Sequence, residues 1–141
     1  MSIGHSLIRI LTVDDHPLLR KGIAALVNTE PDMKLIGEAS NGQEAIEKFR
    51  SHHPDMILMD LQMPGLNGIK AIERILGESP ETRIIVLTTY LGDGQVLRAL
   101  KAGAKAYRLK RQVHRELLET IRAVHAEQKR IPSDLAAEGV S

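Results

Sequence analysis

The sequence predicts an α/β fold: a parallel five-stranded sheet with helices packed on both faces. Apolar runs alternate with amphipathic stretches five times between residues 7 and 124. Three of these runs are almost entirely apolar, as strands buried on both faces should be, whereas the other two are interleaved with charged residues. Five successive strand–helix units require crossover connections, and these join parallel strands.

The strands differ in a way that predicts their order in the sheet. The candidates are Ile8 to Val13, Met33 to Ala39, Met56 to Met59, Ile84 to Leu87 and Ala104 to Leu109. The second contains Lys34 and Glu38, and the fifth contains Lys105 and Arg108, so both suit sheet edges. The resulting order 2-1-3-4-5 is that of a flavodoxin-like, doubly wound (βα)5 sandwich, with its switch point between strands one and three.

Stretches with the apolar spacing of helices lie between the predicted strands, and a further one follows the last strand. The apolar positions are Leu19, Ile23 and Leu26; Ile46 and Phe49; Ile69, Ile72 and Leu76; Val96, Leu97 and Leu100; and Leu117, Ile121 and Val124. Pro17 suits a first helical turn, and Gly77 and Gly103 stand where helices should stop. Gly92 and Gly94 weaken the start of the fourth helix.

Composition narrows the class of protein. The 141 residues suit one domain, and the chain has no cysteine, no apolar run long enough for a membrane span and no signal-peptide pattern. Nineteen basic and 18 acidic residues, with no tryptophan, argue against a dedicated nucleic-acid binder. We therefore expect a cytoplasmic protein that makes no membrane contact.

Polar residues follow the strands at their carboxyl ends, where ligands bind in sheets of this kind. Asp14 and Asp15 follow the first strand, Asp60 the third, Thr88 the fourth and Lys110 the fifth. Clustered carboxylates repel one another unless a hard cation such as Mg²⁺ neutralises them. Lys110 and Thr88 would supply a charge and a hydroxyl to a phosphoryl group. The set suits phosphoryl transfer to a carboxylate.

Each of these residues also has a plainer interpretation. Asp14 and Asp15 could cap the helix that Pro17 begins, and Asp60 could start a turn at Pro64 and Gly65. Thr88 alone could be an ordinary strand residue, and Lys110 alone a solvated one. Taken together, these residues favour a functional site, because the ends of four strands would bring them to the same edge of the predicted sheet.

Histidines nearby are interpreted as structural. His16 is expected to shape the acidic rim, and His52 and His53 to be the frayed end of a helix without a third metal ligand. Gly92-Asp93-Gly94 lacks the residues of a phosphate-binding loop.

Four stretches resemble the receiver domain of two-component response regulators, and two of them are most similar to the NarL/FixJ subfamily, with its LuxR-type helix-turn-helix output. They are Ile10–Pro17, Met59–Gly68, Val86–Tyr90 and Gly103–Lys110. The resemblance implies that Asp60 is the phosphoacceptor for a sensor histidine kinase. It implies Mg²⁺ ligation by Asp15, Asp60 and the main-chain carbonyl of Gln62, with Asp14 acting through water. Thr88 and Tyr107 would then be the switch residues.

Three functions remain open from the residues. A phosphoacceptor switch, which is not an enzyme in the usual sense, fits best. A phosphohydrolase that works through an aspartyl-phosphate would need a second acid where Gln62 stands. A flavin or nucleotide carrier would need a phosphate-binding loop where the acidic pair stands.

The chain is expected to divide into a receiver domain over residues 1–128 and a linker over 129–141. Lys129–Ala136 resembles the linker to a C-terminal DNA-binding domain that this chain lacks, and phosphorylation is expected to promote homodimers that regulate transcription. A stand-alone receiver that acts through protein contacts is the alternative.

Overall fold

A parallel sheet forms the central layer of the computed structural model, which describes residues 7–62, 68–89 and 94–126. Its strands are β1 (Ile8–Val13), β2 (Met33–Ala39), β3 (Met56–Asp60), β4 (Arg83–Thr88) and β5 (Ala106–Leu109). They lie in the order β2-β1-β3-β4-β5, and each neighbouring pair is parallel. This confirms the predicted flavodoxin-like topology, in which the direction of winding reverses between β1 and β3.

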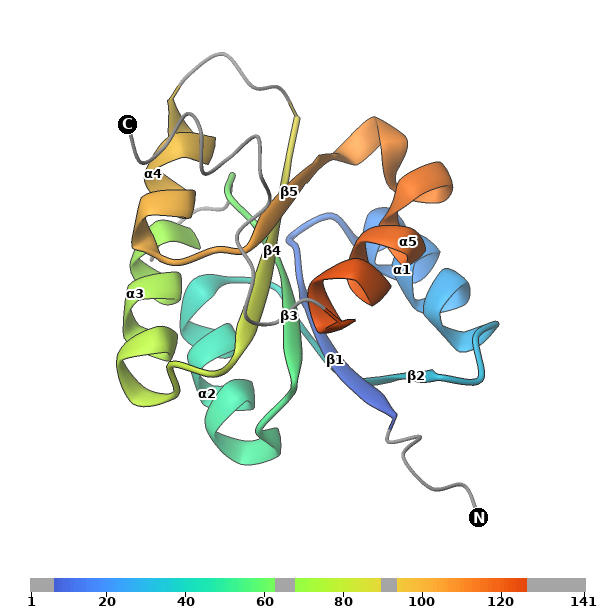
Figure 1. The fold of residues 1–141 in the computed structure, drawn as a ribbon, viewed down its shortest axis with the longest axis horizontal. Helices are drawn as coiled ribbons and strands as arrows, with labels where there is room; N and C mark the ends of the chain where they lie inside the picture. The colour runs from blue at the N-terminus through green and yellow to red at the C-terminus, as the bar shows by residue number, and fades with distance from the viewer. Residues whose placement is uncertain (1–6, 63–67, 90–93, 127–141) are drawn as a thin grey trace.

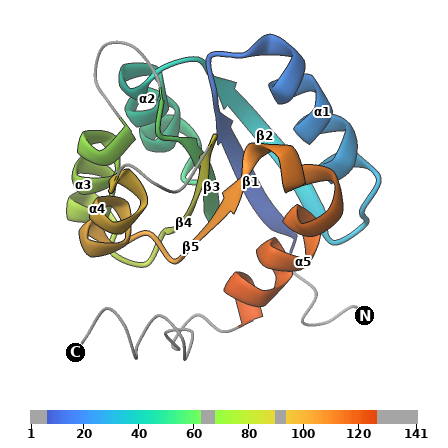
Figure 2. The ribbon, with the colours of Figure 1, turned by 90° about the horizontal axis from the view of Figure 1, so that it is seen from above.

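Helices form a layer on each side of the sheet (Figure 1). One face is covered by α1 (Pro17–Asn28) and α5 (Val113–Ala126), which follows the short 3₁₀ turn η1 (Lys110–Gln112). The other face is covered by α2 (Gly42–His52), α3 (Gly68–Glu78) and α4 (Gln95–Ala102). Figure 2 shows the same two layers from above, with the sheet between them.

The sheet separates two hydrophobic cores, because alternate side chains of each strand point to opposite faces. Leu11, Val13 and Ile57 pack toward α2 and α3, whereas Ile10 and Leu58 pack toward α1 and α5. All five residues of β3 are buried, while β2 exposes Lys34 and Glu38. The prediction of buried central strands and a partly charged edge strand is therefore confirmed.

Some element boundaries differ from the predicted ones. The fifth strand begins at Ala106 and not at Ala104, because Gly103 ends α4 with a φ of +121° and the Ala104 amide still donates to Ala99 O of that helix. Gly77 does not stop α3, which continues to Glu78. Gly103 does end α4, as expected.

Several predicted features are outside the described residues. Gly92 and Asp93 belong to this group, as do Pro64, Gly65 and the expected linker 129–141. Within the described residues, no helix has the length and apolarity that crossing a bilayer requires.

Candidate functional site

Three carboxylates meet where β1 and β3 end. Asp14 and Asp15 follow β1 directly, and Asp60 is the last residue of β3. One donor atom from each, together with one from His16, forms a group whose members all lie within 4.8 Å of one another. Asp14 and Asp60 are fully buried, whereas Asp15 is partly exposed. The structure thus brings the three acidic residues together at the switch point of the sheet, where the topology predicted them.

The turn between β1 and α1 fixes Asp14. Its Oδ1 accepts a hydrogen bond from the His16 main-chain amide at 2.7 Å. His16 is the N-cap residue of α1 and makes no side-chain cap, and Pro17 occupies the first turn of the helix. The alternative that Asp14 or Asp15 caps this helix is therefore wrong, because Asp14 bonds within the turn instead.

Arg20 contributes to this turn, although the sequence did not single it out. Its Nη1 donates to the main-chain oxygen of Asp14 at 2.5 Å, and its Nε donates to Glu38 Oε1 at 3.3 Å. Arg20 thereby connects the acidic turn to β2. A basic residue one turn into the helix after an acidic pair was the available signal, but spacing alone does not show which acceptor it reaches.

Both partners of Asp60 among the described residues contact the same oxygen. Oδ1 accepts from the Gln62 amide at 2.9 Å and lies 2.9 Å from Lys110 Nζ. Oδ2 is buried and accepts no hydrogen bond from the described residues. Burial raises the pKa of Asp60 above its usual value, and the charge of Asp14 acts in the same direction. The Gln62 amide and Lys110 lower that pKa and offset part of the effect.

Lys110 reaches the acidic cluster from the far side of β4. It stands at the start of η1, directly after β5, with Nζ 3.6 Å from Asp14 Oδ2 as well as near Asp60. Its side chain is only 14% exposed. The interpretation of Lys110 as an isolated solvated lysine is therefore wrong.

The end of β4 contacts the segment after β3 through one amide side chain. Thr88 is buried, and Gln62 Nε2 lies 3.5 Å from its Oγ1. Gln62 Oε1 accepts a hydrogen bond from Thr89 Oγ1 at 2.8 Å. The sequence singled out Gln62 for its main-chain carbonyl only, so these side-chain contacts are new.

Tyr107 lies farther from the carboxylates, on β5. It pairs in register with Val86, and Thr88 pairs with Leu109, so Tyr107 and Thr88 belong to the same face of the sheet. Tyr107 is 36% exposed. Tyr107 is therefore partly accessible on the face of the sheet that α4 covers.

The donor set fits a hard divalent cation. Asp14 Oδ2 and Asp60 Oδ2 are buried and accept no hydrogen bond from the described residues, which is costly for ionised oxygens. Carboxylate oxygens and a main-chain carbonyl are the ligands that Mg²⁺ prefers. The residues that could hold the ion are Asp14, Asp15, Asp60 and Gln62. A carboxylate in such a site can accept a phosphoryl group.

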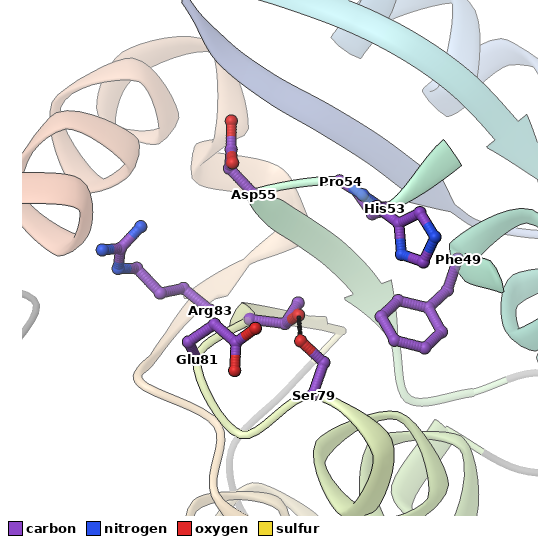
Figure 3. A pocket seen from close by; sticks show the side chains of 8 residues that line it. Phe49, His53, Pro54, Asp55, Ser79, Glu81 and Arg83 are labelled. Atoms are coloured by element: carbon purple, nitrogen blue, oxygen red, sulfur yellow. Dashed lines mark hydrogen bonds between the residues drawn. The ribbon is translucent and has the colours of Figure 1, made fainter. Parts of the chain in front are cut away.

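A pocket lies at the end of the sheet opposite to the acidic cluster, where β3 and β4 begin (Figure 3). Its lining residues are Phe49, His53, Pro54, Asp55, Ser79, Glu81, Thr82 and Arg83. His52 ends α2, and His53 follows as its left-handed C-cap, so the expectation that this pair ends a helix is confirmed. Among the described residues, the group of potential metal donors is the one at β1 and β3, not this pocket.

Comparison with known proteins identifies the family. The response regulator receiver domain family matches residues 10–122. The chain is 39% identical over 135 residues to the transcriptional regulatory protein LiaR of Bacillus subtilis, covering 96% of this chain and 64% of that protein. It is 42% identical over 112 residues to the nitrate/nitrite response regulator protein NarL of Escherichia coli, covering 79% and 52%. It therefore spans between half and two thirds of these relatives.

Solved structures show the same similarity. A LuxR-family two-component response regulator from Aurantimonas superposes with a TM-score of 0.82 at 35% identity, covering 96% of each chain. The response regulator domain of Thermotoga maritima CheB gives a TM-score of 0.77 at 38% identity, covering 83% of this chain and 95% of that one.

Proposed function

This chain belongs to the response regulator receiver domain family, as a receiver of the LuxR/NarL type, and from this membership we propose that Asp60 is its phosphoacceptor. The observation that carries the proposal is Asp60 itself, a buried carboxylate with one oxygen held by Gln62 and Lys110 and the other without a hydrogen bond from the described residues. The donor is the phosphohistidine of a sensor histidine kinase. An Asp60 oxygen forms the new bond to phosphorus, the bond between phosphorus and the imidazole nitrogen breaks, and that nitrogen keeps the electron pair.

The other residues of the site would bind the metal ion and the phosphoryl oxygens. Asp15, Asp60 and the Gln62 carbonyl would hold Mg²⁺, with Asp14 acting through water, and the bound ion would supply positive charge to the phosphoryl oxygens. Lys110 exchanges its contact with Asp60 for one with a phosphoryl oxygen, because the new acyl phosphate removes the carboxylate charge that Lys110 faces. Thr88 donates its hydroxyl to another of these oxygens.

Phosphorylation would shift the protein between two conformations that differ at its surface. Thr88 moves toward the phosphoryl group, and Tyr107, on the same face of the sheet, follows it inward. A partly exposed Tyr107 supports this step, since it can move without leaving a cavity in the core. The altered surface would then promote pairing of two receivers.

The relatives suggest the output. The similar proteins LiaR and NarL are named as a transcriptional regulator and a response regulator, and both extend beyond the matched part. We propose that residues 1–128 are the receiver and that 129–141 lead toward a DNA-binding domain, in a protein that works in the cytoplasm. The test is to read the gene past Ser141 and to assay its full product on promoter DNA with and without phosphorylation. Full-length protein that binds no DNA in either state would favour a stand-alone receiver.

Labelling tests the phosphoacceptor. The protein is incubated with acetyl phosphate and Mg²⁺, and its intact mass is measured over time. The wild type should gain one phosphoryl group, and Asp60→Asn should gain none. Asp32→Asn is the matched control, because it removes an exposed carboxylate near α5 and should label normally. Labelling of Asp60→Asn at the wild-type rate would refute the assignment, and continuous consumption of the donor would indicate a phosphohydrolase.

A further inference from the structure

The pocket where β3 and β4 begin has a well-defined lining, and the proposed function gives it no role (Figure 3). Its volume of about 330 Å³ lies near the lower end of the range for ligand pockets, about 300–1,000 Å³. The rings of Phe49 and His53 pack edge to face in its lining, with their centroids 6.2 Å apart. On the turn before β4, Thr82 donates to Ser79 from its amide at 3.1 Å and from its hydroxyl at 2.9 Å. Contacts within the lining therefore fix the shape of the pocket.

Contacts from β1 fix the loop between α2 and β3, which supplies Pro54 and Asp55 to the lining. Arg9 donates from its guanidinium to the main-chain oxygens of His52 and His53, at 2.7 Å each. The Arg9 amide donates to Asp55 Oδ2 at 3.0 Å, and the Asp55 amide donates to the Arg9 oxygen at 2.9 Å. The loop is thus tied to the sheet, so a ligand would find the pocket already formed.

Helix α5 ends beside this pocket. Arg122, in the last turns of the helix, donates to Asp32 of the turn between α1 and β2 through Nε at 2.9 Å and Nη2 at 2.8 Å. His125 Nδ1 lies 3.4 Å from Nη1 of Arg83, which extends from the pocket toward α5 (Figure 3). The helix ends at Ala126. These contacts therefore bring the start of the following segment to the edge of the pocket.

The residues that follow α5 combine charge and apolar surface. Residues 129–132, outside the described part of the chain, have the sequence Lys-Arg-Ile-Pro. From Ala126, five residues of extended chain span about 17 Å, which takes the chain to Ile131. This reach exceeds the length of the Arg83 side chain, which already connects α5 to the lining. Ile131 can therefore enter the pocket without any change in α5.

The lining offers chemistry that matches this segment. Phe49 and Pro54 are buried and give the pocket an apolar surface. Asp55 and Glu81 add carboxylates, opposite in charge to the basic pair that precedes Ile131. Burial of Ile131 would supply most of the binding free energy, because exposed ion pairs contribute little.

We propose that residues 129–132 dock in this pocket, with Ile131 inserted against Phe49 and the basic pair beside the carboxylates of the lining. Docking would hold the segment that follows the receiver at the end of the sheet opposite to Asp60. The fold itself would then set the direction in which the chain leaves the receiver. The inference goes beyond the proposed function, because it does not require Asp60 to accept a phosphoryl group.

Disulfide trapping in the full chain tests the contact, since the protein has no cysteine of its own. Glu81→Cys combined with Ile131→Cys is equilibrated with reduced and oxidised glutathione, and the fraction of internal disulfide gives the effective concentration of the pair. Pro31→Cys with Ile131→Cys is the matched control, because Pro31 is exposed on the turn that α5 also contacts. We expect an effective concentration at least tenfold higher for the Glu81 pair than for the control.

Two results of the trapping would overturn the proposal. Equal effective concentrations for the two pairs would show that the segment has no preference for the pocket. Disulfide-linked dimers in place of the internal bond would indicate that a second copy of the chain occupies the pocket instead.

Hydrogen exchange provides a readout without engineered cysteines. The amide of Thr82 donates to Ser79 in the lining, so a docked segment should protect it. We expect Ile131→Asp to speed its exchange at least threefold, and Val140→Asp, the same change farther along the segment, to leave it as in the wild type. Equal exchange in all three proteins would overturn the proposal. Exchange and trapping decide the docking whether or not Asp60 is labelled by acetyl phosphate, so failure of the proposed function would be seen separately.

Discussion

Lys110 Nζ lies 2.9 Å from Asp60 Oδ1, so a cation that follows β5 neutralises a buried carboxylate that ends β3. The contact crosses β4, since β3 and β5 are not neighbours in the sheet. Asp60 is fully buried and the Lys110 side chain nearly so, which protects the pair from screening by water and salt. If Asp60 accepts a phosphoryl group, as proposed, this ion pair must rearrange.

Removal of Lys110 should be costly because of this pair. We expect Lys110→Met to lower the free energy of unfolding by about 3 kcal/mol, since loss of one partner leaves a buried charge beside Asp14. The measurement is urea unfolding of the metal-free protein. Lys110→Met combined with Asp60→Asn is the control and should be clearly more stable than Lys110→Met alone. Equal stability of the two would contradict the pairing.

The raised pKa of Asp60 predicts a pH-dependent stability. Because burial raises this pKa, the folded state holds the Asp60 proton more tightly than the unfolded state does. Stability therefore falls as the pH rises from the ordinary pKa of an aspartate through the raised one, and the cost persists at neutral pH. Asp60→Asn removes the cost, so its Tm should exceed that of the wild type at pH 7 by about 3 °C, with the difference shrinking toward pH 4.

Millimolar Mg²⁺ provides the check on this prediction. The ion should raise the Tm of the wild type, because it binds the folded site only, and should raise that of Asp60→Asn much less. A strongly destabilised Asp60→Asn together with no Mg²⁺ effect would show that the carboxylates have a purely structural role.

Two glycines of α3 make a matched pair. A Cβ on Gly68 would lie 2.7 Å from Asp60 O and 3.2 Å from Leu61 Cα, both of which are backbone atoms. Gly68→Ala should therefore push α3 away from Asp60, reduce stability by about 2 kcal/mol and slow the labelling of Asp60 that we propose. A Cβ on Gly77 has no neighbour within 4 Å, so Gly77→Ala should stabilise the helix by about 0.5 kcal/mol. Urea unfolding measures both, and a Gly68→Ala protein as stable as the wild type would disprove the close approach.

Arg20 should act on metal affinity through the turn that it supports. Because Arg20 donates to the Asp14 carbonyl, Arg20→Gln should loosen the turn and weaken Mg²⁺ binding about tenfold, as loss of a supporting contact does at other metal sites. Arg20→Lys should restore part of the affinity. Calorimetry with Mg²⁺ is the measurement, and Arg50→Gln is the control, since Arg50 pairs with Glu78 on the surface. Equal Mg²⁺ affinity in all of these variants would limit Arg20 to a surface role.

Apolar periodicity and strand composition were enough to predict the sheet, its strand order and the edge at which the candidate site lies. Apolar continuity predicted β1, β3 and β4 as central strands, because a strand covered on both faces has no polar side to show. Once the order was set, parallel strands had to bring Asp14, Asp15 and Asp60 to one edge. Both predictions follow from local periodicity and from the topology that it implies, and both can be worked out from the sequence.

Which side chains meet at that edge depends on packing between distant segments, and residue patterns do not reveal it. The contacts of Lys110 with Asp60 and of Gln62 with Thr89 join residues far apart in sequence, and those of Arg20 with Asp14 and of His16 with both acidic residues depend on how one turn folds. Periodicity fixes the face on which a residue lies but not the rotamer of a long side chain or the path of a loop. The start of β5 at Ala106 has the same origin, because the hydrogen bond from Ala104 to α4 outweighs the strand preference of the residues there.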